Sequence, residues 1–132
     1  MKTSELTGVA LDWAVAEAEG LPKAVDSSGF DGPVFVCGFE QEMLHSQYRK
    51  GQEWKAYQPS TDWAQGGPII ERERLSVSPY SFNNVNPWVS HSAEGDKTIV
   101  GPTPLITVMR CYVASKLGNE VDVPELLQGE SK

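Results

Sequence analysis

The chain has 132 residues, with 18 acidic and 11 basic side chains and a net charge of −7. This length predicts one domain over residues 1–132, and the acidic balance argues against general DNA or RNA binding, which depends on Lys and Arg contacts to phosphates. No apolar run reaches the length of a membrane span and residues 1–20 lack a signal-peptide pattern, so we expect the protein to stay in the cytoplasm where it is made.

Residues 4–19, SELTGVALDWAVAEAE, are predicted to form an α-helix. Thr3 or Ser4 is expected to cap its start, and Gly20 to end it. Helical spacing leaves Asp12 pointing into water. The residues predicted to share the apolar face are Leu6, Val9, Ala10, Trp13 and Ala16.

The next predicted element is a strand. Residues 24–33 are rich in turn formers, and PVFVCGF at residues 33–39 is β-branched and aromatic, which is typical of a strand buried on both faces. Residues 40–51 fit a short helix and a loop about equally, so this segment stays open.

The stretch STDWAQGGPIIERERL, residues 60–75, is the most unusual in the chain. Gly66 and Gly67 permit positive φ and Pro68 presets φ for a first helical turn, so we expect a short helix from Pro68 to about residue 74. Ile69 and Ile70 are predicted to enter the core.

Short strands and a turn are predicted after this stretch. LSVSPY, residues 75–80, alternates apolar and polar residues, and Pro79 favours an edge strand. A second strand is expected around Trp88, and a turn at residues 93–97, followed by the short apolar run TIV at residues 98–100.

The clearest element is a helix in TPLITVMRCYVASKLG, residues 103–118. Thr103 caps it, Pro104 occupies the first helical position, Lys116 lies in the last turn and Gly118 ends it. The residues expected on its broad apolar face are Leu105, Ile106, Met109, Tyr112, Val113 and Leu117. The whole pattern predicts an α+β fold with an N-terminal helix, a small mostly antiparallel sheet and a C-terminal helix.

A loop that carries an aromatic ring, a carboxylate and an amide can present them to a ligand. The predicted ligand-binding residues of this chain are Asp62, Trp63, Gln65, Gly66, Gly67 and Arg72. If Trp63 lines a site, part of its indole should stay exposed, whereas a purely structural Trp63 should be buried. The Gly-Gly-Pro sequence alone lacks the spacing of a P-loop or a dinucleotide fingerprint.

No catalytic set or metal site is predicted. Ser60 and Thr61 have no nearby histidine base, and the arginines that flank Glu71 and Glu73 should keep these carboxylates ionised, which suits ion pairs better than acid catalysis. Arg110 is a plausible partner for them. The spacing of the two cysteines and two histidines does not fit a metal site; these residues are Cys37, Cys111, His45 and His91. Both cysteines are expected to be buried and to pack as small hydrophobic residues. No cofactor is expected.

The segment DWAQGGPIIERE, the stretch around Trp88 and the helix TPLITVMRCYVASKLG resemble the NinX family of small tailed-phage and prophage proteins, as does MKTSELTGVALDWAVAEAEG at the start. The resemblance covers both ends and the middle, outside residues 21–57. Some relatives carry Asn-Pro-Leu-Arg where this chain has Thr103-Pro104-Leu105-Ile106. The family carries no established activity; it implies a phage accessory protein in the cytoplasm of the bacterial host.

Three functional hypotheses follow. The first is a noncatalytic phage accessory protein that binds a small ligand or a host factor through residues 61–72, with a nucleotide-like signal as one version, in which Trp63 or Trp54 stacks a base and Arg72 meets phosphate. The second is an acidic protein-interaction module that inhibits a host enzyme. The third is a nucleotide-processing enzyme.

Overall fold

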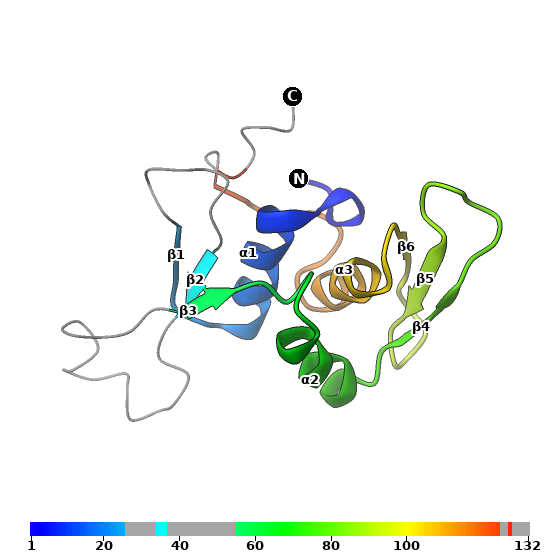
Figure 1. Cartoon of the computed structure of the whole chain (residues 1–132), viewed down its shortest axis with the longest axis horizontal. Helices are drawn as coiled ribbons and strands as arrows, with labels where there is room; N and C mark the ends of the chain where they lie inside the picture. Colours follow the sequence, from blue (N-terminus) through cyan, green and yellow to red (C-terminus); the bar gives the residue numbers. More distant parts are fainter. Residues whose placement is uncertain (26–33, 37–54, 125–126, 128–132) are drawn as a thin grey trace.

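A computed structural model describes residues 1–25, 34–36, 55–124 and 127 of the chain (Figure 1). Its elements are, in order, η1 (Thr3–Glu5), α1 (Gly8–Glu19), β1 (Lys23–Val25), β2 (Val34–Val36), β3 (Lys55–Tyr57), α2 (Trp63–Glu73), β4 (Ser76–Pro79), β5 (Trp88–His91), β6 (Thr98–Gly101) and α3 (Pro104–Leu117). The α+β prediction is confirmed, and the strands in the described part of the chain all pair in antiparallel fashion. The strands divide between two sheets rather than forming one, in the orders β1-β2-β3 and β4-β5-β6.

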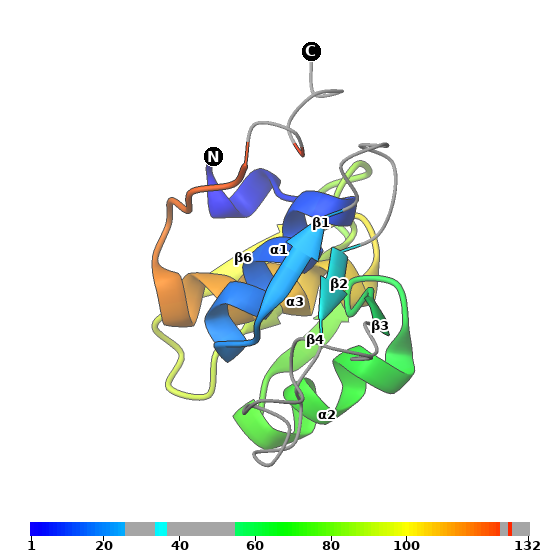
Figure 2. The same cartoon turned by 90° about the vertical axis from the view of Figure 1, so that its left-hand side faces the viewer.

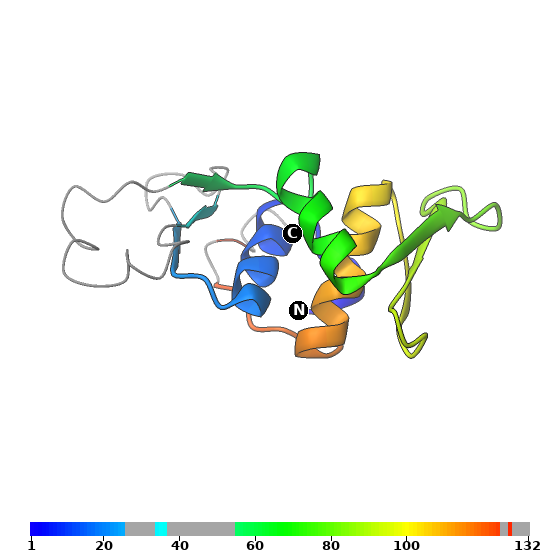
Figure 3. The same ribbon diagram turned by 90° about the horizontal axis from the view of Figure 1, so that it is seen from below.

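Helix α3 lies at the centre of the described chain. It packs against the second sheet on one side and against α1 and α2 on the other (Figures 1 and 3). Its caps are as predicted, because the Thr103 side chain accepts from the Ile106 amide at 3.1 Å and Pro104 opens the helix. The predicted single apolar face was too narrow: residues 107–114 are all buried, so α3 is enclosed on all sides, while Leu117 is exposed.

Arg110 is the one charged side chain in the buried part of α3. Its Nε donates to the Leu6 carbonyl at 2.7 Å and its Nη1 donates to the Val100 carbonyl at 3.0 Å. The predicted pairing of Arg110 with Glu71 or Glu73 is therefore wrong. Backbone carbonyls, rather than carboxylates, satisfy this guanidinium, and they tie the N-terminal segment and β6 to α3.

The predicted helix over residues 4–19 is broken near its start. Residues 3–5 form the 3-10 turn η1, and α1 begins only at Gly8, where φ is +57° and the chain changes direction. Thr3 does not cap α1, because its hydroxyl is buried and donates to the Gly118 carbonyl at 2.8 Å. Gly20 ends α1 in the left-handed conformation, as predicted.

The buried face of α1 also differs from the predicted one. The buried members are Ala10, Leu11, Asp12, Ala14, Val15 and Ala16. Trp13, which was expected in the core, is only partly buried. The first sheet packs on the same helix (Figure 2).

Asp12 is buried rather than directed into water, with 3% of its surface exposed. Its Oδ1 accepts a hydrogen bond from the Ser60 amide at 2.9 Å, which fastens α1 to the turn before α2. Burial raises the pKa of Asp12 to about 6, although the Ser60 amide opposes the rise. A single hydrogen bond does not offset the lost hydration of the carboxylate.

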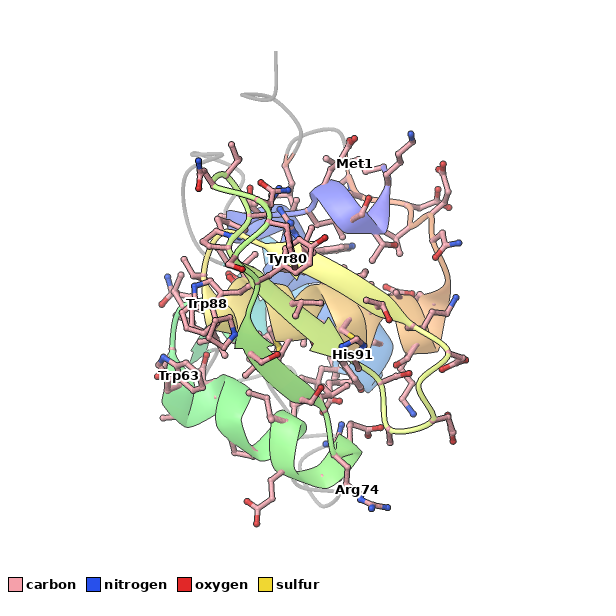
Figure 4. The ribbon with its side chains drawn as sticks, turned by 90° about the vertical axis from the view of Figure 1, so that its right-hand side faces the viewer. Met1, Trp63, Arg74, Tyr80, Trp88 and His91 are labelled. Atoms are coloured by element: carbon pink, nitrogen blue, oxygen red, sulfur yellow. The ribbon has the colours of Figure 1, made fainter. Side chains whose placement is uncertain are left out.

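Strands β4, β5 and β6 pair in register, with Ser78 opposite Val89 and Val89 opposite Val100. The predicted edge strand is confirmed as β4, which lies at the edge of this sheet and ends at Pro79. One face packs on α3, and no described element covers the other face (Figure 4). The residues of that outer face are Ser76, Ser78, Val89, His91, Thr98 and Val100.

Several predictions concern other segments. The strand predicted at residues 33–39 is present at Val34–Val36, and the turn at residues 93–97 is present with Gly95 at φ +78°. Strands β1 and β3 were not predicted. Cys111 is free and buried, as expected. Cys37, His45, Trp54 and the open segment 40–51 lie outside the described residues.

Asp12→Asn tests the cost of the buried carboxylate. The pKa of Asp12 is higher in the folded protein than its ordinary value of 3.8, so the folded state binds the proton more tightly and stability falls as pH rises through the interval from 3.8 to about 6. Asparagine keeps an acceptor for the Ser60 amide and does not titrate. The free energy of unfolding of the wild type, relative to the variant, should fall by up to about 3 kcal/mol across this interval. Urea unfolding at a series of pH values measures the difference, and a difference that does not vary with pH contradicts the assignment.

Candidate functional site around Trp63

The unusual stretch forms a longer helix than predicted. Helix α2 begins at Trp63, five residues before Pro68, and its N-cap is Asp62, whose Oδ1 accepts from the Ala64 amide at 2.9 Å. Gly66 and Gly67 lie inside the helix and neither has positive φ. The predicted glycine turn before Pro68 is therefore wrong. Asp62 caps the helix, so the chain needs no glycine at its start.

Gly66 serves close packing. A Cβ atom at this position would lie 2.6 Å from the Pro59 carbonyl oxygen and 2.8 Å from Cδ1 of Leu105, whereas one at Gly67 would meet nothing within 4 Å. The absent side chain lets α2 approach the start of α3. Ile69 is buried and Ile70 packs against the core, as predicted.

The side-chain amide of Gln65 is used within the fold. Its Oε1 accepts from the Gln58 amide at 2.6 Å, and its Nε2 donates to the Ala56 carbonyl at 3.0 Å. Gln65 therefore holds the connection between β3 and α2 against the helix, and both ends of its amide already have partners.

Arg72 lies at the opposite end of α2 from Trp63. The two residues are nine positions apart in the sequence, which corresponds to roughly 14 Å along a helix axis. The guanidinium is 2.6 Å from Glu19 and 2.8 Å from Glu73, and it donates to the Tyr112 hydroxyl at 3.3 Å. The Tyr112 hydroxyl also donates to Glu19.

These contacts form a polar cluster that joins the ends of α1 and α2 to the middle of α3. The hydrogen bond from Arg72 lowers the pKa of Glu73, despite the opposing effect of burial, and Lys116 lies 3.5 Å from the same carboxylate. Arg72 and Glu73 therefore act as ion-pair partners. Glu71 is exposed.

The structure thus separates the six predicted residues into two ends of one helix. At the first end, Trp63 keeps 55% of its surface exposed, which confirms the expected partial exposure, and Asp62 is exposed beside it. The indole borders a hollow of about 240 Å³, formed where the starts of α2 and α3 meet. All of its lining residues are uncharged; they are Ser60, Thr61, Trp63, Thr103, Pro104, Leu105 and Ile106.

A second exposed feature, not predicted from the sequence, is the β4–β5 connection. Phe82 is 86% exposed and Val85 is 76% exposed. The loop is nevertheless held in shape: the Tyr80 amide donates to the Pro87 carbonyl at 2.7 Å, and Asn83 Oδ1 accepts from the amides of residues 85 and 86, each at 2.9 Å. The Phe82 ring packs edge-on against Tyr80, with 5.5 Å between centroids.

A sequence signal for this feature existed. Residues 75–92 contain no Asp, Glu, Lys or Arg, in a chain with 29 such residues, and two prolines bracket the loop. Trp63, Tyr80 and Trp88 lie along the same side of the molecule (Figure 4). Residues 75–92 therefore contribute no Asp, Glu, Lys or Arg side chain to this side, whereas Asp62 beside Trp63 is charged and exposed.

An open groove of about 540 Å³ lies on another face, between α1 and residues 120–124. The Lys23 ammonium sits 4.8 Å from the centroid of the Trp13 ring and 2.7 Å from Glu17 at the border of this groove. The aromatic face and the carboxylate that would attract a cation are thus partly used by a lysine of the same chain.

Among the described residues, no group of three or more His, Cys, Asp or Glu side chains is placed so that it could hold a metal ion. His91 is exposed and its Nδ1 lies 3.0 Å from the Thr98 hydroxyl. None of the described helices has the length and apolar character needed to cross a membrane.

The fold and its exposed features define a small α+β protein built around one enclosed helix. The chain belongs to the NinX family: the family model described as "Bacteriophage P22, NinX" matches residues 2–116. The resemblance inferred from the sequence is confirmed, and it extends across residues 21–57. No curated protein matches the chain.

The two adjacent glycines provide a matched test of the packing at the start of α2. Gly66→Ala should lower the free energy of unfolding by about 1–3 kcal/mol, because the Pro59 carbonyl is backbone and cannot move aside cheaply. Gly67→Ala meets no atom within 4 Å beyond its chain neighbours, and its gain in helix propensity is opposed by crowding of the new Cβ against the Pro68 ring, so it should change stability by less than about 1 kcal/mol. Thermal and denaturant unfolding measure both changes, and equal effects of the same sign would show that Gly66 has no packing role.

The two arginines at the end of α2 provide a second matched pair. Arg72→Ala should cost about 0.5–1.5 kcal/mol, with a smaller cost at high salt, because it removes a partner from Glu19, Glu73 and Tyr112. Arg74→Ala, an exposed neighbour, should stay within about 0.5 kcal/mol of wild type. Denaturant unfolding at low and high salt compares the two variants. If both behave alike, Arg72 is not part of a stabilising cluster.

Proposed function

We propose that this phage accessory protein is noncatalytic and binds a small ligand or a host factor through the Asp62–Trp63 turn and the hollow beside it. The supporting observation is the 55% exposure of Trp63 at the rim of an uncharged hollow of about 240 Å³. A large aromatic side chain left in water at a concave, apolar site is typical of a binding surface.

The character of the hollow favours a host protein over a charged small molecule. Its volume suits one apolar or aromatic side chain, and its lining offers no charge to a ligand. Tryptophan is enriched among the residues that dominate binding energy at protein interfaces. The partner should therefore insert an apolar side chain next to Trp63.

The nucleotide-like version has weaker support. Trp63 remains free to stack on a base, but Arg72 lies at the other end of α2 and already pairs with Glu19 and Glu73. A phosphate would have to compete with two carboxylates for this guanidinium. Gln65 is likewise engaged with backbone groups.

The two remaining hypotheses use the acidic residues. Inhibition of a host enzyme through an acidic surface rests on the net charge of −7. A nucleotide-processing enzyme would need Glu71 or Glu73 beside a base or a metal, and Glu73 already pairs with Arg72 and Lys116. The exposed Trp63 surface has the better geometric support.

Trp63→Ala tests the proposal. Because more than half of the side chain is already in water, the variant should lose about 1 kcal/mol or less, well below the roughly 3–5 kcal/mol typical of a buried tryptophan. Binding should be lost. Glu71→Ala, an exposed change elsewhere on α2, should retain both stability and binding.

Two measurements read out binding. Affinity capture from phage-infected cells should recover one host protein with the wild type and with Glu71→Ala, and lose it with Trp63→Ala. Calorimetry with nucleotides and cyclic nucleotides tests the small-ligand version. If capture from infected cells and calorimetry are both unchanged in Trp63→Ala, the binding surface lies elsewhere.

A further inference from the structure

The groove between α1 and residues 120–124 combines apolar surface with acidic side chains. Its volume of about 540 Å³ falls within the range of pockets that bind ligands. The charged residues of its lining are Glu17, Glu120 and Asp122, and the lining contains no lysine or arginine. The rest of the lining is apolar and consists of Trp13, Ala14, Leu117, Val121, Val123 and Pro124. An occupant that matches this groove carries both positive charge and apolar surface.

A lysine of this chain already shows which charged group suits the α1 side of the groove. The Lys23 ammonium lies 4.8 Å from the centroid of the Trp13 ring and 2.7 Å from a carboxylate oxygen of Glu17. An aromatic face and a carboxylate together attract an alkylammonium group. Because Lys23 neutralises Glu17, an external cation is left with the two acids of the opposite wall.

Glu120 and Asp122, on that wall, are exposed and form no ion pair with any described residue. Two cations of the chain are near but bind elsewhere or not at all. The Met1 ammonium donates to the Val121 carbonyl at 2.8 Å, and Lys2 faces Glu120 across an isolated antiparallel bridge without forming an ion pair. The net charge of −7 adds to the attraction of these two carboxylates for a cationic partner.

The same wall has an open backbone edge at Glu120. The Val121 amide donates to the Met1 carbonyl at 3.0 Å, and the Thr3 amide donates to the Asn119 carbonyl at 2.9 Å. In an antiparallel pair with this pattern, the residue between the two bonds directs its own amide and carbonyl away from the paired segment. Among the described residues, no backbone group bonds to the amide or carbonyl of Glu120. An extended peptide can add to such an edge through main-chain hydrogen bonds.

We propose that this groove binds an extended, basic segment of a partner protein, with lysine or arginine side chains opposite Glu120 and Asp122 and apolar side chains over Leu117. Successive side chains of a strand point to opposite faces, so a segment in which basic and apolar residues alternate supplies both groups at once. Leu117, which is 36% exposed, then leaves water. The groove and the hollow beside Trp63 have no lining residue in common, so this proposal does not depend on the proposed function.

A fluorescein-labelled synthetic peptide in which lysine and valine alternate, with both ends blocked, is the probe. Fluorescence anisotropy with the purified full chain measures its affinity. The wild type should bind this peptide, and it should bind the counterpart with glutamate in place of lysine at least about tenfold more weakly, because like charges then face each other. Added salt should weaken binding of the lysine peptide, since exposed charges are screened.

Variants of the groove locate the bound peptide. Glu120→Lys and Asp122→Lys reverse an exposed charge of the lining, and each should weaken binding of the lysine peptide about tenfold. Glu71→Lys makes the same change in net charge at an exposed position of α2 and should stay within about twofold of wild type. Leu117→Ser removes apolar surface and should weaken binding about threefold or more. Circular dichroism confirms that each variant is folded.

Three results overturn the proposal: a wild type that does not bind the lysine peptide, a wild type that binds the glutamate peptide equally well, or a Glu71→Lys protein that loses as much affinity as Asp122→Lys. Spermine separates a peptide site from a site for small organic cations. If spermine binds as tightly as the peptide and displaces it, peptide docking is overturned. Trp63→Ala should bind the lysine peptide like the wild type, so the outcome for the groove is read independently of host-factor capture.

Discussion

The guanidinium of Arg110 joins the distant N-terminal segment and the neighbouring strand β6 to α3. It is 6% exposed, and it bonds to the carbonyls of Leu6 and Val100 from the middle of a helix that is otherwise apolar. Burial lowers the pKa of Arg110, partly countered by Glu5, but a guanidinium stays protonated in proteins. The N-terminal turn and the second sheet must therefore sit where their carbonyls can solvate this charge. Their positions around α3 follow from that requirement.

Because α3 is enclosed, the positions of α2 and of the second sheet depend on how closely each can pack against it. Gly66 allows α2 to lie close to Leu105, which brings the starts of two helices together and leaves a concave space between them. On the other side, Gly101 lies so close to Thr107 that a Cβ atom would be 2.4 Å from its hydroxyl oxygen. Both close approaches are possible because Gly66 and Gly101 have no side chain. Trp63 and Phe82 are exposed at the borders of this tightly packed centre.

Local signals predicted the elements that local interactions determine. Thr103, Pro104 and Gly118 mark the ends of α3, Gly20 ends α1, and Pro79 indicates an edge strand, since each effect depends on the backbone of a few neighbouring residues. The start of α1 was wrong because Thr3 has a distant partner, the Gly118 carbonyl. Asp12 was assigned to water because no periodicity reveals that the Ser60 amide will reach it.

At the candidate site, too, local features were predicted correctly and contacts between distant residues were not. Exposure of Trp63 followed from its polar neighbours, but the grouping of Arg72 with it assumed a compact loop, and a continuous helix holds them apart. The partners of Arg72 come from α1 and α3, which sequence proximity does not indicate. Phe82 was overlooked because an apolar residue near a strand is normally assigned to the core.

The contacts of the first residues have a kinetic consequence. The Thr3 amide bonds to the Asn119 carbonyl at 2.9 Å, and the Met1 ammonium bonds to the Val121 carbonyl at 2.8 Å. A ribosome adds roughly 5 to 20 residues per second, so the nascent N-terminal segment waits several seconds for its partners to be synthesised. Its apolar face is open to chaperones and proteases during that interval. Contacts of such long sequence separation also slow folding, and a chain cut before α3 would lack the helix on which its core is assembled.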